Sequence, residues 1–271
     1  MKIGFCYDTK VDYGYPENNL EYTDFVSLDT VSEIGKAIEQ NGYTLEYIGN
    51  VYKLREQLVN NSFDCDLVFN IAEGFGSRNR EAILPGLLEL YNIPHTASDI
   101  YGMSINMNKQ HTKILANSIG VPVAKGFCFD NLSDEVIEQA RNLKLPFILK
   151  PNCEGGSMGL YLIYSIEDFI KKAKFLIEIY SFELLAEEYI EGVEITVPVI
   201  GNGKDTTALG VVTILNEDGT NINLYDNSLK QIDNVINSPN FMYGDALKNK
   251  ILDYSVKIHK FFHLCDYSRM D

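Results

Sequence analysis

Two kinds of hydrophobic pattern divide the chain, and the first covers residues 1–105. Short apolar runs alternate there with longer segments in which apolar residues recur every three or four positions. The runs predict strands, and the amphipathic segments predict helices. In chain order these elements are expected at residues 2–7, 24–40, 44–48, 51–59, 66–70 and 81–90. Strands that alternate with helices predict an open parallel sheet with helices on both faces, which is an α/β domain.

The carboxyl ends of these predicted strands indicate a first candidate site. Ligands of open α/β sheets bind beyond the carboxyl ends of the strands. The segments that follow Asp8 and Asn70 are therefore expected at the mouth of a site. No GxGxxG motif follows the first strand and the chain contains no GxxxxGK(S/T) motif, so neither a dinucleotide site nor a P-loop is supported.

The second pattern begins near Asn106, where strands follow one another across short turns as well as across helices. This change predicts a second unit with antiparallel strands, of the α+β class. Helices are expected at residues 109–119, 133–143, 166–179 and 247–262. Strands are expected at residues 124–129, 147–150, 160–164, 184–190, 193–200, 208–215 and from 265 onward. Residues 216–244 are polar with little periodicity, so a loop is expected there.

Residues 147–159 of this second unit carry the clearest candidate for chemistry. An apolar run ends at Lys150, a loop rich in glycine and serine follows, and the apolar pattern resumes at Leu160. A glycine-rich turn lets backbone N–H groups surround an anion, and a lysine adds a full positive charge. The ligand that fits this combination is a polyphosphate. A hairpin with a solvated lysine is the alternative that this segment alone leaves open.

Composition and charge narrow the class of partner. The 271 residues are 45% hydrophobic, which is enough for two or three domains. The formal net charge is -15 at pH 7, and such an acidic surface repels nucleic acid and anionic membranes, so neither is expected as a partner. No apolar run approaches the roughly 20 residues of a membrane span, and the first residues are typical of a strand rather than a signal peptide.

The cysteines indicate a cytoplasmic location. There are five, an odd number, widely spaced and without a CxxC pair. This pattern argues against a disulfide framework or a zinc site and favours a reducing compartment.

A series of short motifs along the chain, taken in order, resembles one enzyme family. They are Val68-Phe69-Asn70, residues 93–98, 108–113, 146–159 and 187–194, Lys230, and Arg269-Met270-Asp271. Their order and spacing are similar to the D-alanine–D-alanine ligase family of the ATP-grasp superfamily, over residues 1–271. The resemblance implies a Rossmann-like, pre-ATP-grasp substrate domain at residues 1–105. It further implies a central ATP-grasp lobe at 106–186 and a C-terminal ATP-grasp lobe at 187–271.

The resemblance also implies a reaction. In this family ATP phosphorylates a carboxylate, and an amine then attacks the acyl phosphate to form a peptide-like bond. ATP and Mg²⁺ (or Mn²⁺) are the implied cofactors, amino-acid-like small molecules are the implied substrates, and a homodimer is compatible with the apolar helix faces. Phosphoryl transfer depends on neutralising charge on ATP more than on covalent help from the protein.

The residues that match the family's motifs take their roles from the resemblance. ATP is expected to contact Lys109, Lys150, Gly155, Gly156, Ser157, Glu187, Glu188, Tyr189, Ile190 and Glu194. The two lysines would hold the α- and β-phosphates, and Glu194 would hold the ribose hydroxyls. Lys230 would reach the γ-phosphate, and Arg269 would stabilise the oxyanion of the tetrahedral intermediate. Asp271 would bind Mg²⁺, which prefers carboxylate and phosphate oxygens.

The positions expected to contact the first substrate depart from the family's pattern. Thr23, Gly156 and Gln231 stand where the family has a glutamate, a serine and a tyrosine. Glu73 replaces a histidine that usually follows the third strand. Losing a glutamate that meets an amino group removes a charge-assisted hydrogen bond worth roughly 1.5–3 kcal/mol. We therefore expect a substrate other than plain D-alanine, and Arg78 and Arg80 are candidates to bind a carboxylate.

The chain stops at Asp271, before the strand that supplies further metal ligands in this family. We expect either a fragment of a longer protein, a partner that supplies the rest, or a chain that no longer catalyses. Two alternatives to a carboxylate–amine ligase follow from this. One is a non-catalytic nucleotide-binding protein with the same fold, and the other is a small-molecule kinase that stops at the acyl phosphate.

Overall fold

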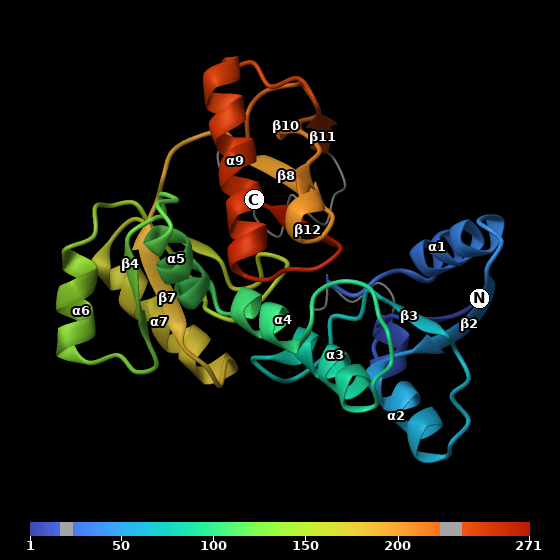
Figure 1. The fold of residues 1–271 in the computed structure, drawn as a ribbon. Coiled ribbons are helices and arrows are strands. Elements are labelled where there is room, and N and C mark those ends of the chain that lie inside the picture. The colour runs from blue at the N-terminus through green and yellow to red at the C-terminus, as the bar shows by residue number, and fades with distance from the viewer. Residues whose placement is uncertain (17–23, 223–234) are drawn as a thin grey trace. The chain divides into compact units, whose positions relative to one another are not determined.

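The computed structural model describes residues 1–16, 24–222 and 235–271 (Figure 1). The chain forms two compact units. Unit 1 comprises Met1–Ser104 and His263–Tyr267, and unit 2 comprises Ile105–Phe262 and Ser268–Asp271. None of the helices that the structure describes is both long enough and apolar enough to span a membrane.

Unit 1 is built on a three-stranded parallel sheet with the strand order β2–β1–β3. Its strands are β1 (Lys2–Cys6), β2 (Thr44–Gly49) and β3 (Leu67–Asn70). Its helices are α1 (Leu28–Gln40), α2 (Val51–Val59) and α3 (Arg80–Leu90), with a 3-10 turn, η1, at Lys10–Tyr13. Helix α4 (Ile100–Met107) begins in unit 1 and ends in unit 2. Strand β1 runs parallel to both neighbours, so the predicted parallel sheet is confirmed.

Two helices of this region differ from the prediction. Helix α1 begins at Leu28 rather than at residue 24, because the Ser27 hydroxyl accepts a hydrogen bond from Thr30 N at 3.1 Å and caps the helix there. Helix α4 was not predicted. Its sequence, IYGMSINM, is apolar nearly throughout, so it lacks the alternation of apolar and polar faces that marks a surface helix.

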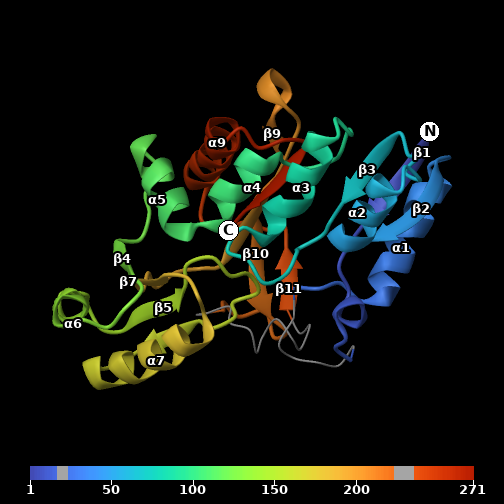
Figure 2. The same cartoon turned by 90° about the horizontal axis from the view of Figure 1, so that it is seen from below.

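The first part of unit 2 is an antiparallel sheet with the strand order β4–β7–β5–β6. Its strands are β4 (Gly126–Phe129), β5 (Phe147–Pro151), β6 (Tyr161–Ile163) and β7 (Leu184–Glu188). The helices of this part are α5 (Lys109–Ser118), α6 (Asp134–Arg141) and α7 (Ile166–Ile179). Helix α7 contacts β5, β6 and β7 (Figure 2), and Phe169 and Leu176 on it join Phe147, Leu149 and Ile163 in the core.

The second sheet of unit 2 has the order β11–β10–β8–β12, and β9 pairs with β8. Its strands are β8 (Ile195–Ile200), β9 (Thr207–Ala208), β10 (Val212–Asn216), β11 (Val235–Ser238) and β12 (Tyr267–Met270). Helix α9 (Asp245–Phe261) contacts β8 and β9, and η2 (Gly203–Asp205) is a 3-10 turn. The core of this part gathers Val197, Val199 and Val211.

Two predictions for this sheet were wrong. The single strand expected at residues 208–215 is interrupted and forms β9 and β10, which pair with opposite ends of β8. The expected loop at 216–244 contains β11, which pairs with β10. Since β11 is only half apolar and short, its strand conformation comes from that pairing rather than from any periodic signal.

Candidate functional site

The sheet of β5, β6 and β7 presents two different faces. Phe147 and Leu149 point into the core. Side chains alternate along a strand, so Ile148 and Lys150 point to the opposite face. Ile148 is paired in register with Glu187 on β7, which places the Glu187 carboxylate on the same face as the Lys150 ammonium group. One face thus builds the core, and the other gathers the predicted charged residues.

Glu187 binds two lysines on this face. One carboxylate oxygen, Oε1, pairs with Lys150 Nζ, and the other, Oε2, pairs with Lys113 Nζ of helix α5. The Glu187 side chain is only 8% exposed, against 22% for Lys150 and 16% for Lys113. Burial acts to raise the pKa of Glu187, but the two ammonium groups outweigh burial and hold the pKa below its usual value. Glu187 is therefore a carboxylate at neutral pH.

Buried Asn152 connects the start of helix α5 to the end of β5. Its backbone carbonyl accepts from Lys109 N at 3.1 Å, and its side-chain oxygen accepts from Gln110 N at 3.0 Å. Its side-chain amide donates to Asn108 Oδ1, the helix cap, at 3.1 Å. Lys109 Nζ in turn donates to the Glu154 carbonyl. These bonds place the Lys109 side chain at the loop that follows β5, the strand that carries Lys150.

The glycine- and serine-containing loop between β5 and β6 has a left-handed backbone. Gly156, Ser157 and Gly159 have φ angles of 57°, 58° and 68°. The turn is closed by a hydrogen bond of 3.1 Å from Met158 N to the Gly155 carbonyl. A glycine-rich turn of this kind lets backbone N–H groups approach an anion. The predicted pair of antiparallel strands joined by this loop is confirmed.

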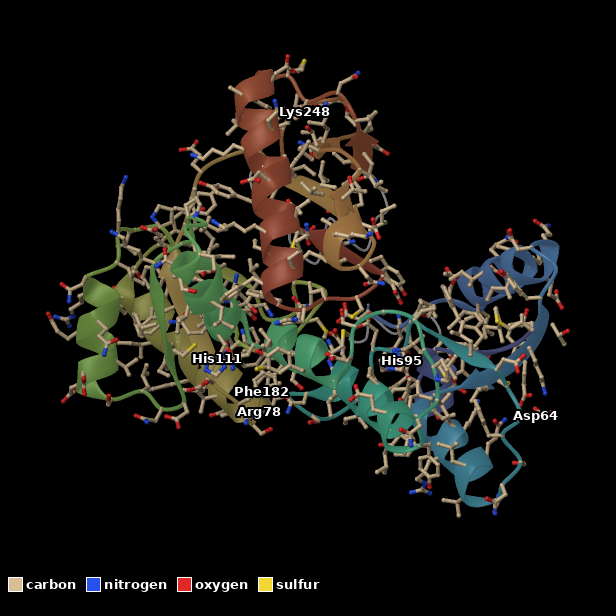
Figure 3. All side chains as sticks on the ribbon, viewed as in Figure 1. Asp64, Arg78, His95, His111, Phe182 and Lys248 are labelled. Carbon is tan, nitrogen blue, oxygen red and sulfur yellow. The ribbon has the colours of Figure 1, made fainter. Side chains whose placement is uncertain are left out.

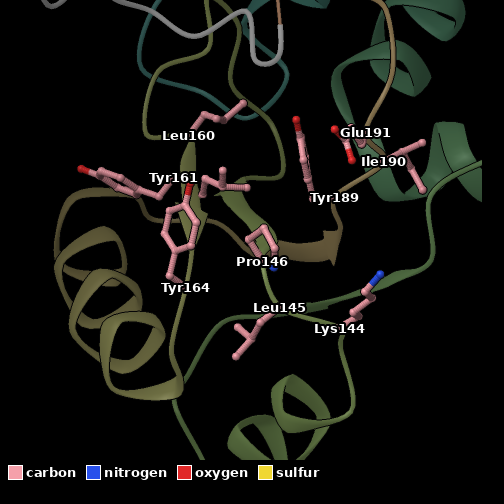
Figure 4. A pocket seen from close by; sticks show the side chains of 10 residues that line it. Lys144, Leu145, Pro146, Leu160, Tyr161, Tyr164, Tyr189, Ile190 and Glu191 are labelled. Carbon is pink, nitrogen blue, oxygen red and sulfur yellow. The ribbon is translucent and has the colours of Figure 1, made fainter.

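A cavity of about 860 Å³ lies beside the segment that follows β7 (Figure 4). Its lining includes the rings of Tyr164 and Tyr189 and the apolar side chains of Pro146, Leu162 and Ile190. Two lining residues, Tyr161 and Leu162, pair with Leu149 and Ile148, so the cavity lies beside the β5–β6 part of this sheet. The volume lies in the usual range of small-molecule sites, about 300–1,000 Å³. Aromatic and aliphatic walls of this kind suit a flat, apolar ring.

Two further residues predicted to contact ATP, Glu188 and Glu194, lie in different surroundings. Glu188 Oε1 accepts from Lys125 N at 2.9 Å, so this side chain fixes the chain before β4. Glu194 lies between β7 and β8 with a half-buried side chain, and its carbonyl accepts from Ile214 N at 2.9 Å. Glu194 is thus positioned by its backbone at the point where the chain passes to the second sheet.

Arg269 and Asp271 lie at the end of the chain, on and just after β12. Arg269 Nε lies 3.2 Å from Asp271 Oδ1, and the same carboxylate oxygen accepts from Thr196 Oγ1 at 2.7 Å. The side chains of the arginine and the aspartate are 69% and 58% exposed. An exposed ion pair contributes little to stability, so both groups can exchange this contact for a ligand at small cost.

His259 on helix α9 is a supporting residue that the sequence did not indicate. It is buried, its Nδ1 lies 2.7 Å from Ser268 Oγ, and its Nε2 lies 3.1 Å from the Gly201 carbonyl. Ser268 immediately precedes Arg269, so His259 fixes the strand that carries the predicted catalytic arginine. A histidine at helical spacing is common in cores, and its sequence neighbours give no sign of this contact.

In unit 1 the segments after β1 and β3 come together, as predicted. The buried Asp8 carboxylate accepts from Tyr13 Oη at 2.6 Å and from Gly74 N at 2.8 Å. Gly74 has φ of 69°, and a side chain there would meet the Arg80 carbonyl at 2.2 Å, so this close approach requires glycine. The Tyr13 ring stacks on Phe75 with centroids 5.1 Å apart.

Arg80 does not have the role that its sequence position suggested. Its side chain is 7% exposed, and its guanidinium contacts Glu73 Oε2 at 3.3 Å, Glu81 Oε1 at 3.2 Å and Asp24 Oδ2 at 3.0 Å. A further bond of 2.8 Å joins it to the Glu73 carbonyl. A guanidinium buried among three carboxylates is not placed to bind a substrate carboxylate, whereas Arg78 is exposed (Figure 3).

One guanidinium cannot neutralise three carboxylates. Burial, together with the charges of Glu81 and Asp24, raises the pKa of Glu73 to about 8, although Arg80 acts in the opposite direction. Glu73, predicted as a substrate residue, therefore carries a proton at neutral pH and can donate a hydrogen bond.

This raised pKa predicts a pH-dependent stability. The folded chain keeps the Glu73 proton up to about pH 8, whereas the unfolded chain releases it near its ordinary value of 4.5. The free energy of unfolding is thus expected to fall as the pH rises from about 4.5 to 8. Glu73→Gln, which cannot titrate, should flatten this decline in urea denaturation, and the exposed Glu56→Gln should leave it unchanged. Equal slopes for wild type and Glu73→Gln would contradict the prediction.

A second group of acidic residues in unit 1 is poorly suited to bind a metal ion. Glu46, Asp64 (Figure 3) and Cys65 place ligand atoms within 4.8 Å of one another. Lys2 Nζ already pairs with both carboxylates of this group. Burial and the Glu46 charge raise the pKa of Cys65 to about 11, so its thiol stays protonated.

Three predicted site residues, Thr23, Lys230 and Gln231, lie outside the described residues.

Comparison with known proteins relates this arrangement to one group of enzymes. Residues 115–271 match the family model described as "D-ala D-ala ligase C-terminus". The D-alanine–D-alanine ligase of Carboxydothermus hydrogenoformans is 30% identical over 257 residues, covering 91% of this chain and 78% of that protein. The ligase of Xanthomonas axonopodis pv. citri is 31% identical over 192 residues, covering 70% of this chain and 58% of that protein.

Solved structures show the same fold. The ATP complex of D-alanine–D-alanine ligase from Bacillus anthracis superposes with a TM-score of 0.72 and 19% identity, covering 99% of this chain and 79% of that chain. The VanG D-Ala:D-Ser ligase from Enterococcus faecalis superposes with a TM-score of 0.73 and 20% identity, covering 99% of this chain and 84% of that chain.

Proposed function

The chain belongs to the D-alanine–D-alanine ligase family, whose members are ATP-dependent ligases that form a carbon–nitrogen bond, and we propose that it joins an amino-acid-like carboxylate to an amine through an acyl phosphate. The fold is that of ATP-grasp enzymes. We assign residues 1–105 to a Rossmann-like substrate domain, 106–186 to the central lobe and 187–271 to the C-terminal lobe. The observation that supports the function best is the pairing of Glu187 with Lys113 and Lys150 beside an anion-binding loop.

The nucleotide fits the face of the sheet that carries Lys150. In our proposal the adenine ring occupies the cavity beside Tyr189 and Ile190, where aromatic and aliphatic side chains offer a stacking surface. The phosphates then extend toward Lys109 and Lys150, and the amides of the loop at Ser157 close over them. Glu194 receives the ribose hydroxyls, since a carboxylate accepts two donors.

The end of the chain supplies the charges for the second half of the reaction. Arg269 neutralises the oxyanion that forms when the amine attacks the acyl phosphate. Asp271 has the hard oxygen donors that suit Mg²⁺ (or Mn²⁺), and its present partners, Arg269 and Thr196, leave it largely exposed. The metal, when bound, would neutralise phosphate charge. Lys230 is assigned to the γ-phosphate by the family resemblance.

The substrate differs from plain D-alanine in this proposal. Glu73 stands where the family has a histidine, and because its pKa is raised to about 8 it can donate a hydrogen bond near neutral pH, as a histidine can. Gly156 offers no hydroxyl where the family has a serine. The first of these positions keeps a hydrogen-bond donor, and the second loses one. Thr23 and Gln231, which stand where the family has a glutamate and a tyrosine, are the other two substrate positions that differ.

A phosphate-release screen across D- and L-amino acids and hydroxy acids, run on the product of the complete gene, tests this function. We expect ATP-dependent phosphate release with a substrate pair other than two D-alanines, and slow release with D-alanine alone. Efficient formation of the D-alanine dipeptide would refute the altered substrate. ADP formation that needs no amine would indicate the kinase instead, and nucleotide binding with no turnover on any substrate would indicate the non-catalytic protein.

A further inference from the structure

Lys113 is a lysine to which the family resemblance assigns no contact with ATP, yet it lies within the group of charges that surrounds Lys150. It pairs with Glu187 Oε2 while Lys150 pairs with Glu187 Oε1, and all three side chains are largely buried. The arrangement places the carboxylate between the two ammonium groups. Lys113 follows Lys109 by four residues on α5, which is one helical turn, so the same helix presents both lysines on one side.

We propose that Lys113 is a positioning residue that offsets the charge of Glu187 and so keeps the positive charge of Lys150 available to the phosphates of the nucleotide. The inference rests on the proposed function, because it concerns the same nucleotide site. With both lysines in place, the two cations and one carboxylate carry a net charge of +1. Without Lys113, Glu187 neutralises Lys150, and this pair offers an arriving polyphosphate no net charge.

Burial makes this balance matter. In a partly buried setting the effective dielectric constant is well below that of water, so an uncompensated charge acts on a neighbouring phosphate over several ångströms. Glu187 is the most buried of the three groups, and removing one of its two partners leaves its negative charge directed at Lys150 alone. The effect of Lys113 on the nucleotide is therefore expected to pass entirely through Glu187.

A double-mutant cycle separates this role from a purely structural one. Affinity for ADP with Mg²⁺ is measured by titration calorimetry for wild type, Lys113→Met, Glu187→Gln and the double variant, with Lys113→Arg as the conservative replacement. Lys113→Met should weaken binding about tenfold, which is the scale expected for one lost unit charge in a partly buried setting. In the Glu187→Gln background the same change should cost less than about threefold, since no carboxylate remains to be offset.

The controls fix what each result means. Lys174→Met removes an equal charge from the exposed side of helix α7, and it should bind ADP as wild type does. Lys113→Arg, which keeps the positive charge, should bind ADP with the affinity of wild type. Equal affinity of Lys113→Met and Lys174→Met, or an equal cost of Lys113→Met in both backgrounds, would overturn the inference. If Lys113→Met does not fold, as judged by circular dichroism, the comparison of Glu187→Gln with the double variant decides: a loss above threefold overturns it, and a smaller loss supports it.

Failure of the inference can be told apart from failure of the proposed function. If wild type binds ADP and Lys150→Ala does not, the nucleotide site stands whatever Lys113 does. If wild type binds no ADP, the proposed function and the inference fall together.

Discussion

Replacing Lys150 by alanine is expected to abolish the stabilisation of this protein by ADP and Mg²⁺. Lys150 is the cation at the mouth of the glycine- and serine-containing loop, and its removal leaves Glu187 paired with Lys113 alone, a group with no net charge. A phosphate would then lose a charge-assisted hydrogen bond of about 1.5–3 kcal/mol and the long-range attraction of the same charge. Together these losses should reduce affinity by more than about a hundredfold.

Thermal unfolding with and without nucleotide measures this effect. A ligand at 100 times its Kd adds about 2.7 kcal/mol to the free energy of unfolding, which is a rise of several degrees for wild type. Lys150→Ala should show no such rise, and the exposed Lys174→Ala should show the wild-type rise. The comparison uses the shift on adding ligand, because losing the Glu187 pair also changes the stability of the free protein. If ADP and Mg²⁺ raise the unfolding temperature of Lys150→Ala as much as that of wild type, the assignment of Lys150 to the nucleotide site is wrong.

The sequence was sufficient to predict the features that depend on local pattern. The apolar run and the loop around Lys150 predicted both strands and the turn between them, and the alternation of residues 1–105 predicted the parallel sheet. These signals are strong because hydrophobic periodicity and glycine content act over a few neighbouring residues. The resemblance assigned Glu187 to the nucleotide site, and the structure places it beside Lys150 on the same face of the sheet.

Features that depend on contacts distant in the sequence could not be predicted. The bond between Lys113 and Glu187 joins residues 74 positions apart and depends on the register of β5 with β7. Strand β11 exists through its pairing with β10, and His259 meets Ser268 only because α9 returns along its sheet. A cytoplasmic location, a homodimer and the roles of Thr23, Lys230 and Gln231 stay predictions.

Arg80 illustrates the same difference for a charged residue. In the sequence, an arginine that follows a glycine-containing loop and precedes a helix is typical of solvated surface. In the structure, Gly74 allows the loop to fold back against the Arg80 backbone, and the guanidinium is enclosed by Glu73, Glu81 and Asp24. Arg80 thus holds the loop after β3 in place, and its contribution is to the stability of unit 1.

Replacing Arg80 by methionine is accordingly expected to destabilise unit 1 by about 3–5 kcal/mol, the usual cost of breaking a buried ion pair from one side. The three carboxylates would remain together with no cation among them. Since they can relieve this repulsion only by taking up protons, the loss should be larger at pH 8 than at pH 5. The exposed Arg78→Met removes the same charge from the same loop and should change stability by less than about 0.5 kcal/mol.

Thermal unfolding followed by circular dichroism at the two pH values measures this difference. Arg80→Met should unfold roughly 10 °C below Arg78→Met at pH 8, given about 2–4 °C per kcal/mol for a chain of this size. Adding Glu73→Gln to Arg80→Met should recover part of the loss at pH 8, because it replaces a carboxyl group that must stay protonated in the folded chain with an amide that cannot ionise. Equal unfolding temperatures for Arg80→Met and Arg78→Met would show instead that the carboxylates relax into solvent, and that the guanidinium does not hold the loop.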